Sequence, residues 1–169
     1  MVCNPCKCKE LVVRKKNHNV LYSPFNIIPQ CNSFVLLGVA LQSDGKFNEH
    51  VRTKLVKANK CLHVLRTLRK EHYSQAEIDQ IFISIVLPNV SYALSVYGAS
   101  ESDLTVIQNF LDRCHKRRFI SFPFFIKNLL NKQDWNILKK LISTHCHPVK
   151  DIIPVQAWKL IQSVLWTPL

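Results

Sequence analysis

Carboxylates are the residues that would hold catalytic metal ions, and their spacing in this chain disfavours such a site. The sequence contains 11 Asp and Glu residues, and no two of them are adjacent. A two-metal site needs carboxylates held close enough to share two cations. Glu77 with Asp79, and Glu101 with Asp103, lie at predicted helix starts, where acids stabilise the helix dipole. We therefore predict no catalytic residue in this chain.

Cysteine and histidine are the candidate metal ligands. A Cys-x2-Cys-x-Cys cluster at residues 3–8 has the close spacing that zinc favours, and a His-Cys-His triplet follows only at residues 145–147. A structural zinc site normally uses two paired knuckles, so this arrangement favours reduced thiols over a metal site. The seven cysteines are an odd number, and no apolar export signal precedes Leu11. We predict no metal ligand, and a cytoplasmic or nuclear location.

Basic residues form the most informative pattern. Lysine and arginine number 23 against 11 acids, a net charge of +12, and such an excess is typical of chains that bind a polyanion. Basic residues recur between Val51 and Lys70 without a single acid, and a second cluster ends a later predicted helix. Basic residues at a helix C-terminus also complement its dipole. The residues predicted to bind nucleic-acid phosphates, without reading base sequence, are Arg52, Lys57, Lys60, Lys70, Arg113, Lys116, Arg117 and Arg118.

The elements that would position these residues fall into two regions. The first 42 residues contain short β-prone runs at Leu11–Val13, Val20–Tyr22 and Phe25–Ile28. The run Phe34–Leu41 is almost wholly apolar, as a strand buried on both faces would be. These runs predict a small β-meander.

From Phe47 onward the apolar period changes to that of a helix. One stripe comprises Phe47, Val51, Leu55, Ala58, Leu62 and Leu65, and the basic residues Arg52, Lys57, Lys60 and Lys70 lie opposite it. Further helices are predicted after a Ser74–Glu77 capping box, from Val90 to Tyr97, after Ser102, and over Ile126–Ile142. The uncharged stretch from Gln80 to Ser100 is interpreted as a buried helix pair broken at Pro88. The predicted class is α+β, a meander followed by a mainly helical bundle.

Several short motifs together resemble one family. They are Asn4-Pro5-x-Lys7-Cys8-Lys9-Glu10-Leu11-Val12-Val13, Phe34-x-x-Leu37-Gly38-Val39, His50, Lys57-Ala58-x-Lys60, Leu87-Pro88-Asn89-Val90-x-Tyr92 with Tyr97-Gly98, Arg113-x-x-x-Arg117-Arg118, and His147-Pro148 with Ile152-Ile153-Pro154. In this order they resemble the reverse transcriptase of non-LTR (LINE-type, jockey-like) retrotransposons.

The resemblance implies the end of a polymerase palm at residues 1–42, a thumb at 43–154 and a divergent tail at 155–169. Leu37, Gly38 and Val39 resemble the primer-grip element. In that family the Asn-Pro-x-Lys-Cys-Lys segment follows the aromatic-x-Asp-Asp turn, so the fragment would start after the catalytic aspartates and be inactive by itself. The intact family enzyme uses Mg²⁺, and we expect no cofactor in this fragment.

The expected partners are the backbone of an RNA–DNA or other duplex, bound non-specifically, and an upstream polymerase portion if one is encoded. Two other functions remain open: a basic helical module that binds a protein or a membrane, and an element remnant without function. The one-sided basic helix with few exposed aromatic residues favours duplex backbone over lipid, so we expect no membrane partner.

Overall fold

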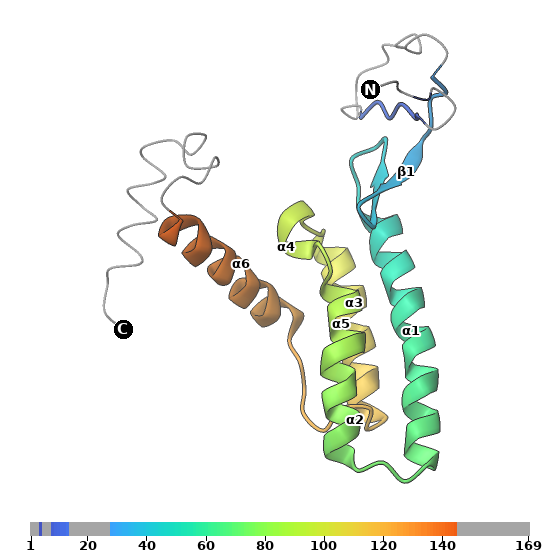
Figure 1. Cartoon of the computed structure of the whole chain (residues 1–169), viewed down its shortest axis with the longest axis vertical. Helices are drawn as coiled ribbons and strands as arrows, with labels where there is room; N and C mark the ends of the chain where they lie inside the picture. The colour runs from blue at the N-terminus through green and yellow to red at the C-terminus, as the bar shows by residue number, and fades with distance from the viewer. Residues whose placement is uncertain (1–3, 5–7, 14–27, 145–169) are drawn as a thin grey trace. The chain divides into compact units, whose positions relative to one another are not determined.

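The structure is a computed structural model that describes residues 4, 8–13 and 28–144. The chain forms two compact units, residues 1–130 and 131–169. A two-stranded antiparallel sheet comes first and helices follow (Figure 1). This order agrees with the coarse α+β class. The predicted domain boundaries after residues 42 and 154 stay predictions, and 155–169 lie outside the described residues.

The apolar run Phe34–Leu41 folds as a hairpin, and the prediction of one strand buried on both faces was wrong. Strand β1 (Ser33–Leu36) pairs antiparallel with β2 (Val39–Gln42). Between them, Leu37 and Gly38 have φ values of 49° and 78°, and positive φ at both central residues is what a two-residue type I′ turn requires. Strand β1 is mostly exposed, whereas β2 starts with two buried residues. The apolar run alone does not distinguish one buried strand from two strands, and it is Gly38 that allows the turn between them.

The predicted meander is reduced to this hairpin and one bridge among the described residues. Leu11–Val13 forms no strand. Instead, Glu10 forms an isolated parallel bridge with Gln30, in which its N–H donates to the Pro29 carbonyl over 3.1 Å. The predicted strand Val20–Tyr22 and all but the last residue of Phe25–Ile28 lie outside the described residues, and Ile28 itself is in no strand.

Helix α1 (Asn48–Lys70) confirms the predicted amphipathic helix. Val51, Ala58, Leu62 and Leu65 are buried, at spacings of three, four and seven residues that place them on one side. The opposite side is therefore left to solvent, and the basic residues occupy it.

The second helical segment begins as predicted. Ser74 precedes α2 (Gln75–Ile81), and its hydroxyl accepts the N–H of Glu77 while the Glu77 carboxylate accepts the N–H of Ser74. This reciprocal capping box satisfies two backbone donors that a helix start leaves unpaired.

Pro88 does not break this segment, contrary to the prediction. Helix α2 passes into one π-helical turn, η2 (Phe82–Val86), and then into α3 (Leu87–Ser91). Proline has no N–H, and its ring crowds the carbonyl four residues earlier. The wider π turn, in which the Leu87 N–H reaches the Phe82 carbonyl, lets the helix continue. The chain turns only at Tyr92 and Ala93, before the short α4 (Leu94–Tyr97).

Helix α5 (Glu101–Lys116) begins after Ser100, two residues before the predicted cap at Ser102. Ser100 is selected because Asp103 completes a capping box with it. Helix α6 (Ile126–Ser143) confirms the last predicted helix to within one residue.

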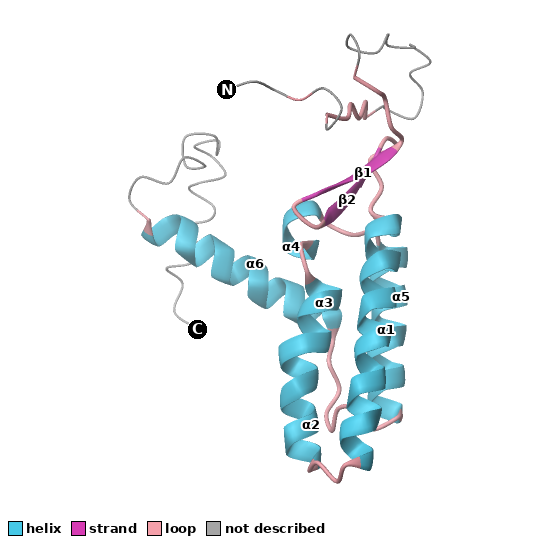
Figure 2. Ribbon diagram, turned by 45° about the vertical axis from the view of Figure 1, so that its right-hand side comes forward, coloured by secondary structure: helices cyan, strands magenta, loops and turns pink. Residues whose placement is uncertain are grey.

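Three helical rods lie side by side in the first unit: α1, the α2–η2–α3 rod, and α5 (Figure 2). Each contributes side chains to one core, and the largest fully buried ones include Leu65, Ile78, Phe82, Ile107 and Phe110. The start of α6 joins this core through Ile126.

The α2–η2–α3 rod belongs to a stretch, Gln75–Val96, that is long and apolar enough to cross a membrane by length and composition alone. In the structure, Ile78, Phe82, Val86 and Val90 of this stretch are core residues.

Candidate nucleic-acid interface

The C-terminal ends of α1 and α5 are joined by arginine side chains. The Arg69 guanidinium donates to the Arg117 carbonyl over 3.2 Å and to the Arg118 carbonyl. Arg66 and Arg69 also lie over the ring of Phe119, at 5.6 and 5.2 Å from its centroid. Phe119 is buried, so the two guanidiniums cover the edge of the core with cation–π contacts. The two helix ends are thereby fixed to one another.

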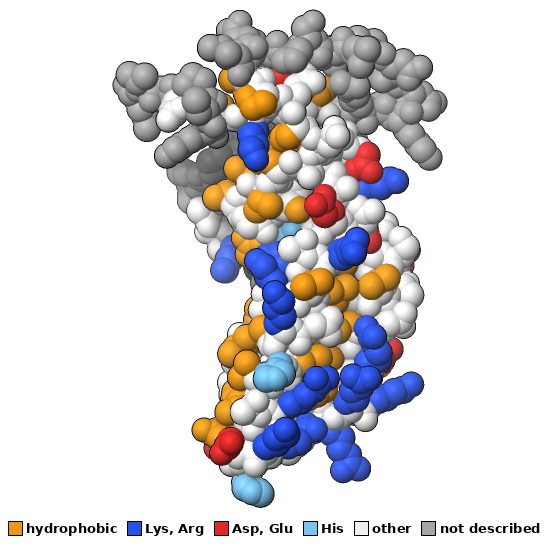
Figure 3. Space-filling model, turned by 90° about the vertical axis from the view of Figure 1, so that its right-hand side faces the viewer, with side chains coloured by type: hydrophobic (Ala, Val, Ile, Leu, Met, Phe, Trp, Pro, Cys, Tyr) orange, Lys and Arg blue, Asp and Glu red, His pale blue; other side chains and the backbone are white. Residues whose placement is uncertain are grey.

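The basic side chains around this junction form one exposed surface. We define the basic surface as Lys60, Arg66, Arg69 and Lys70 of α1 with Arg113, Lys116, Arg117 and Arg118 at the end of α5. Figure 3 shows lysine and arginine side chains gathered over the lower half of the face that α1 occupies. Both ion pairs found among the described residues lie elsewhere, between Lys46 and Asp44 and between Lys127 and Glu101. Exposed acids close in sequence to these helix ends include Glu71, Glu77 and Asp112, and the eight cations outnumber them.

The structure places five of the eight residues that the sequence indicates at the two helix ends that Arg69 joins: Lys70, Arg113, Lys116, Arg117 and Arg118. Lys60 is exposed ten positions before Lys70, about 15 Å along α1. Arg52 is exposed but lies 18 positions before Lys70, about 27 Å along the helix. Lys57 is exposed on the other flank of α1, about 140° round from Lys70.

Arg66 and Arg69 were not selected from the sequence because they border the apolar stripe and do not lie opposite it. Their position at the edge of the stripe, three residues apart, is the signal that would have found them. A basic residue at such an edge can reach a neighbouring segment, and both of these arginines contact the residues that directly follow α5.

The space between α1 and α5 is too small to hold an organic ligand. A cleft lined by Asn59, Leu62, Arg113 and Arg117, among others, has a volume of about 30 Å³. Small-molecule sites are about ten times larger at least. The basic surface is therefore suited to an extended polyanion lying across it.

The hairpin turn predicted to resemble a primer grip packs against Tyr92. The Tyr92 hydroxyl donates to the Leu37 carbonyl over 2.7 Å. A Cβ on Gly38 would lie 3.6 Å from the same tyrosine ring. The Leu37 side chain is 82% exposed, whereas Val39 is buried. The turn thus presents one apolar side chain to solvent in a backbone conformation that leucine rarely adopts.

A buried histidine ties this hairpin to the helices. His50 of α1 accepts the Ala40 N–H at Nδ1 and donates from Nε2 to the Tyr92 carbonyl, each over 3.2 Å. Burial lowers the pKa of His50, and Lys54 and Lys57 lower it further against the opposing effect of the Tyr92 hydrogen bond. The imidazole is therefore held neutral.

Lys54 also contacts Tyr92. Its ammonium lies 3.9 Å from the centroid of the Tyr92 ring. Burial, followed by the nearby charge of Lys57, lowers the pKa of Lys54. Lys54 is thus a packing partner of Tyr92 and not part of the basic surface.

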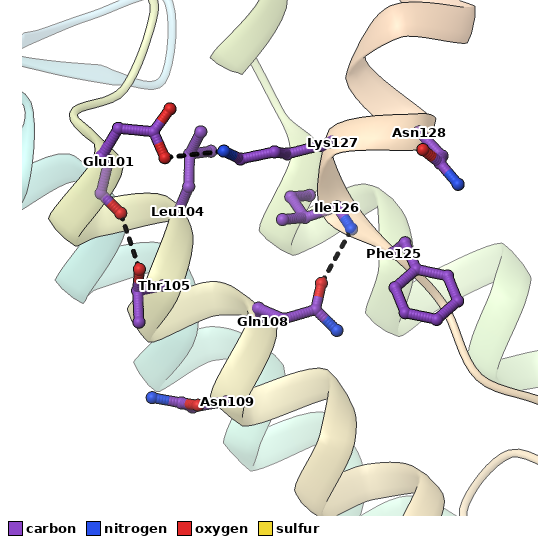
Figure 4. A pocket seen from close by; sticks show the side chains of 9 residues that line it. All are labelled: Glu101, Leu104, Thr105, Gln108, Asn109, Phe125, Ile126, Lys127 and Asn128. Carbon is purple, nitrogen blue, oxygen red and sulfur yellow. Dashed lines mark hydrogen bonds and ion pairs between the residues drawn. The ribbon is translucent and has the colours of Figure 1, made fainter.

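A larger pocket lies where α5 meets the start of α6 (Figure 4). Its volume is about 550 Å³. Gln108 holds the two segments together, because its Oε1 accepts the Ile126 N–H and its Nε2 donates to the Phe124 carbonyl, each over 3.0 Å. An ion pair of 2.8 Å between Lys127 and Glu101 spans one edge.

The described residues contain no group of three His, Cys, Asp or Glu side chains that could hold a metal ion. Cys3, Cys6 and residues 145–147 lie outside the described residues. Cys114 is buried in the core, and burial raises the pKa of its thiol to about 11 although Arg113 and Arg117 act in the opposite direction. This thiol stays protonated at neutral pH and is a poor nucleophile.

No protein-family model, no curated protein and no solved structure matches this chain. The assignment of a function therefore rests on its residues and their geometry.

Proposed function

We propose that this chain binds the phosphate backbone of duplex nucleic acid without reading its sequence, as the palm-end and thumb part of a LINE-type reverse transcriptase. The observation that carries the binding proposal is the basic surface that α1 and α5 share. Its cations come from two helices that the Arg69 hydrogen bonds fix together, and none of them is engaged in an ion pair among the described residues.

Phosphate binding explains a surface of this kind. Cations gathered without ion-pair partners repel one another, and a phosphate backbone removes that repulsion while it releases its condensed counterions. Lysine and arginine contacts to phosphate position a protein on a duplex but carry no base specificity. The expected binding is therefore sequence-independent and steeply weakened by salt.

The order of the sequence motifs supports the family part of the proposal. The Leu37–Gly38 turn precedes the basic helix, as a primer-grip-like element precedes a thumb in the family that the chain resembles. The coding sequence upstream of this chain tests this part directly: an aromatic-x-Asp-Asp turn within a few tens of codons supports it, and an unrelated or absent reading frame overturns it.

The binding proposal is tested by a triple charge reversal, K60E with K70E and K116E, measured by fluorescence anisotropy on an RNA–DNA duplex across a salt series. All three lysines are exposed, and no hydrogen bond or ion pair to them is described, so the fold should be retained. Each lost phosphate contact should lower the log–log salt slope by about 0.7–0.9. The expected result is a slope smaller by about 2–3 and much weaker binding at low salt.

A matched control reverses three exposed lysines of α6, as K132E with K139E and K140E. This variant has the same net charge as the first, so it should bind more tightly if the basic surface is the interface. Equal losses in the two variants, or no loss in the first, would overturn the proposal. Tighter binding of the unaltered chain to anionic vesicles than to duplex would favour a membrane module instead.

A further inference from the structure

We propose that the pocket between α5 and the start of α6 takes an unpaired nucleobase of a nucleic acid whose backbone lies on the basic surface. This inference rests on the proposed function and extends it to a single-stranded extension of the duplex. The pocket's volume of about 550 Å³ lies within the range of sites for small organic ligands.

An aromatic face borders this pocket. Phe125 is 57% exposed, and Figure 4 shows its ring at one side of the pocket, across from the α5 residue Gln108. The floor is apolar and includes Leu104 and Ile126. Base stacking on an aromatic ring is the main source of affinity in many sites for single-stranded nucleic acid, and it is tolerant of sequence.

Polar groups at the rim suit the edges of a base. The side-chain amides of Asn109 and Asn128 line the pocket, and no hydrogen bond from either is found among the described residues. In contrast, both ends of the Gln108 amide are used within the fold. A free amide offers a donor and an acceptor, which is what the edge of an unstacked base presents in return. Both asparagines are exposed, so their amides are open to a ligand from solvent.

The charges around the pocket favour a neutral ligand there. Glu101 is neutralised by Lys127 over 2.8 Å, and Asp112 accepts a hydrogen bond from the Gln108 amide. The pocket itself therefore has no excess of positive charge that would attract a phosphate. A base, with a neutral ring and polar edges, matches this environment.

The pocket and the basic surface share one side of α5. Asn109, Arg113 and Lys116 recur at spacings of four and three residues, which places them in one row. Arg113 Nε also donates to the Asn109 carbonyl over 3.2 Å. A strand whose phosphates contact Arg113 and Lys116 thus passes the mouth of the pocket.

The segment that carries Phe125 is anchored on both sides. Ser121 donates its N–H to the Asp79 carboxylate of α2 over 3.0 Å, and Gln108 holds Phe124 and Ile126. The aromatic face is therefore in place before a ligand arrives, which lowers the entropic cost of binding.

The experiment compares three ligands by anisotropy: a blunt RNA–DNA duplex, the same duplex with a single-stranded overhang, and one whose overhang is abasic. The overhang should bind more tightly than the other two. F125A should lose that advantage, about 5- to 150-fold, and bind the blunt duplex unchanged. F125W should restore it, and 2-aminopurine in the overhang should show stacking with the wild-type and F125W chains but not with F125A.

F122A is the matched control, because Phe122 is 43% exposed, lies in the same segment and does not line the pocket. Equal effects of F122A and F125A, or equal binding of the normal and abasic overhangs, would overturn the pocket proposal. If the blunt duplex binds while the overhang adds nothing, only the pocket proposal fails. If no duplex binds, the proposed function fails, and free single strands with and without bases still decide the pocket.

Discussion

His50 is the residue that ties the hairpin to the helices. It links the second strand, the first long helix and the carbonyl of Tyr92 through the two nitrogens of one imidazole. Both hydrogen bonds require the neutral ring with its proton on Nε2, because the Ala40 N–H needs an acceptor. Protonation would abolish that acceptor and place a charge near Lys54 and Lys57.

We predict that stability falls with acid through His50. The folded pKa is below the ordinary value of 6.5, so the unfolded chain binds more protons just below pH 6.5. The free energy of unfolding should therefore be flat for this group above that pH and should decrease as the pH falls towards the folded pKa. Urea unfolding at pH 7.5, 6.5 and 5.5 measures this dependence, and H50Q should be less stable at pH 7.5 but less sensitive to acid.

The exposed His63 of the same helix provides the control. H63Q should keep the acid sensitivity of the unaltered chain. If the free energy of unfolding of H50Q decreased with acid as steeply as that of the unaltered chain, His50 would not be the cause of the acid sensitivity.

At the scale of elements, the two faces of α1 have different roles. One side supplies the core, and the other side carries the cations of the proposed interface. The apolar side should therefore control stability, and the basic side should control binding.

We predict that L62A destabilises the protein by about 2–5 kcal/mol, since Leu62 is buried between the helices and its loss leaves a cavity. V64A changes an exposed residue of the same helix and should stay within about 0.5 kcal/mol of the unaltered protein. Chemical denaturation followed by circular dichroism measures both. Similar losses in the two variants would mean that α1 does not pack in the core as described.

The α2–η2–α3 rod contains a proline in its interior, a position that normally interrupts a helix. Pro88 is accommodated by the π turn before it, which leaves Val86 and Val90 on the core side. The rod ends at Tyr92, whose hydroxyl donates to the Leu37 carbonyl of the hairpin and whose carbonyl accepts a hydrogen bond from His50 of α1. The position of the turn is thus set by packing against the first strands.

At the scale of the molecule, the helical core and the hairpin differ in the number of packing contacts that stabilise them. The three rods share one cluster of buried side chains, whereas β1 and β2 form an isolated two-stranded sheet, an element of marginal stability by itself. The hairpin depends on its contacts with His50 and Tyr92.

Hydrogen exchange should show this difference. We predict the slowest exchange at core amides such as those of Leu65, Phe82 and Phe110, and faster exchange across β1 and β2. The reason is that the hairpin can open without the core, whereas the core amides exchange only when the bundle unfolds. Mass spectrometry of peptides from the exchanged protein measures it. The strongest protection in residues 33–42 would contradict this division.

The sequence alone determined α1, the start of α2 and α6. The three-to-four-residue recurrence from Val51 to Leu65, the Ser74–Glu77 cap and the Ile126 helix are local signals, because a helix closes its hydrogen bonds within one segment. The apolar side of α1 and most of its exposed cations were found in the same way. The excess of positive charge in the sequence also indicated a polyanionic partner.

Only the tertiary structure decided which cations lie together and which contacts hold the hairpin. Arg69 meets the carbonyls of Arg117 and Arg118, and Tyr92 meets Leu37 across 55 residues. The hairpin and the passage through Pro88 were misjudged for local reasons, because Gly38 was not read as a turn and proline by itself does not indicate the π turn that precedes it. Periodicity places a residue on one side of its own helix, but the partner of that side is set by the packing of the other helices.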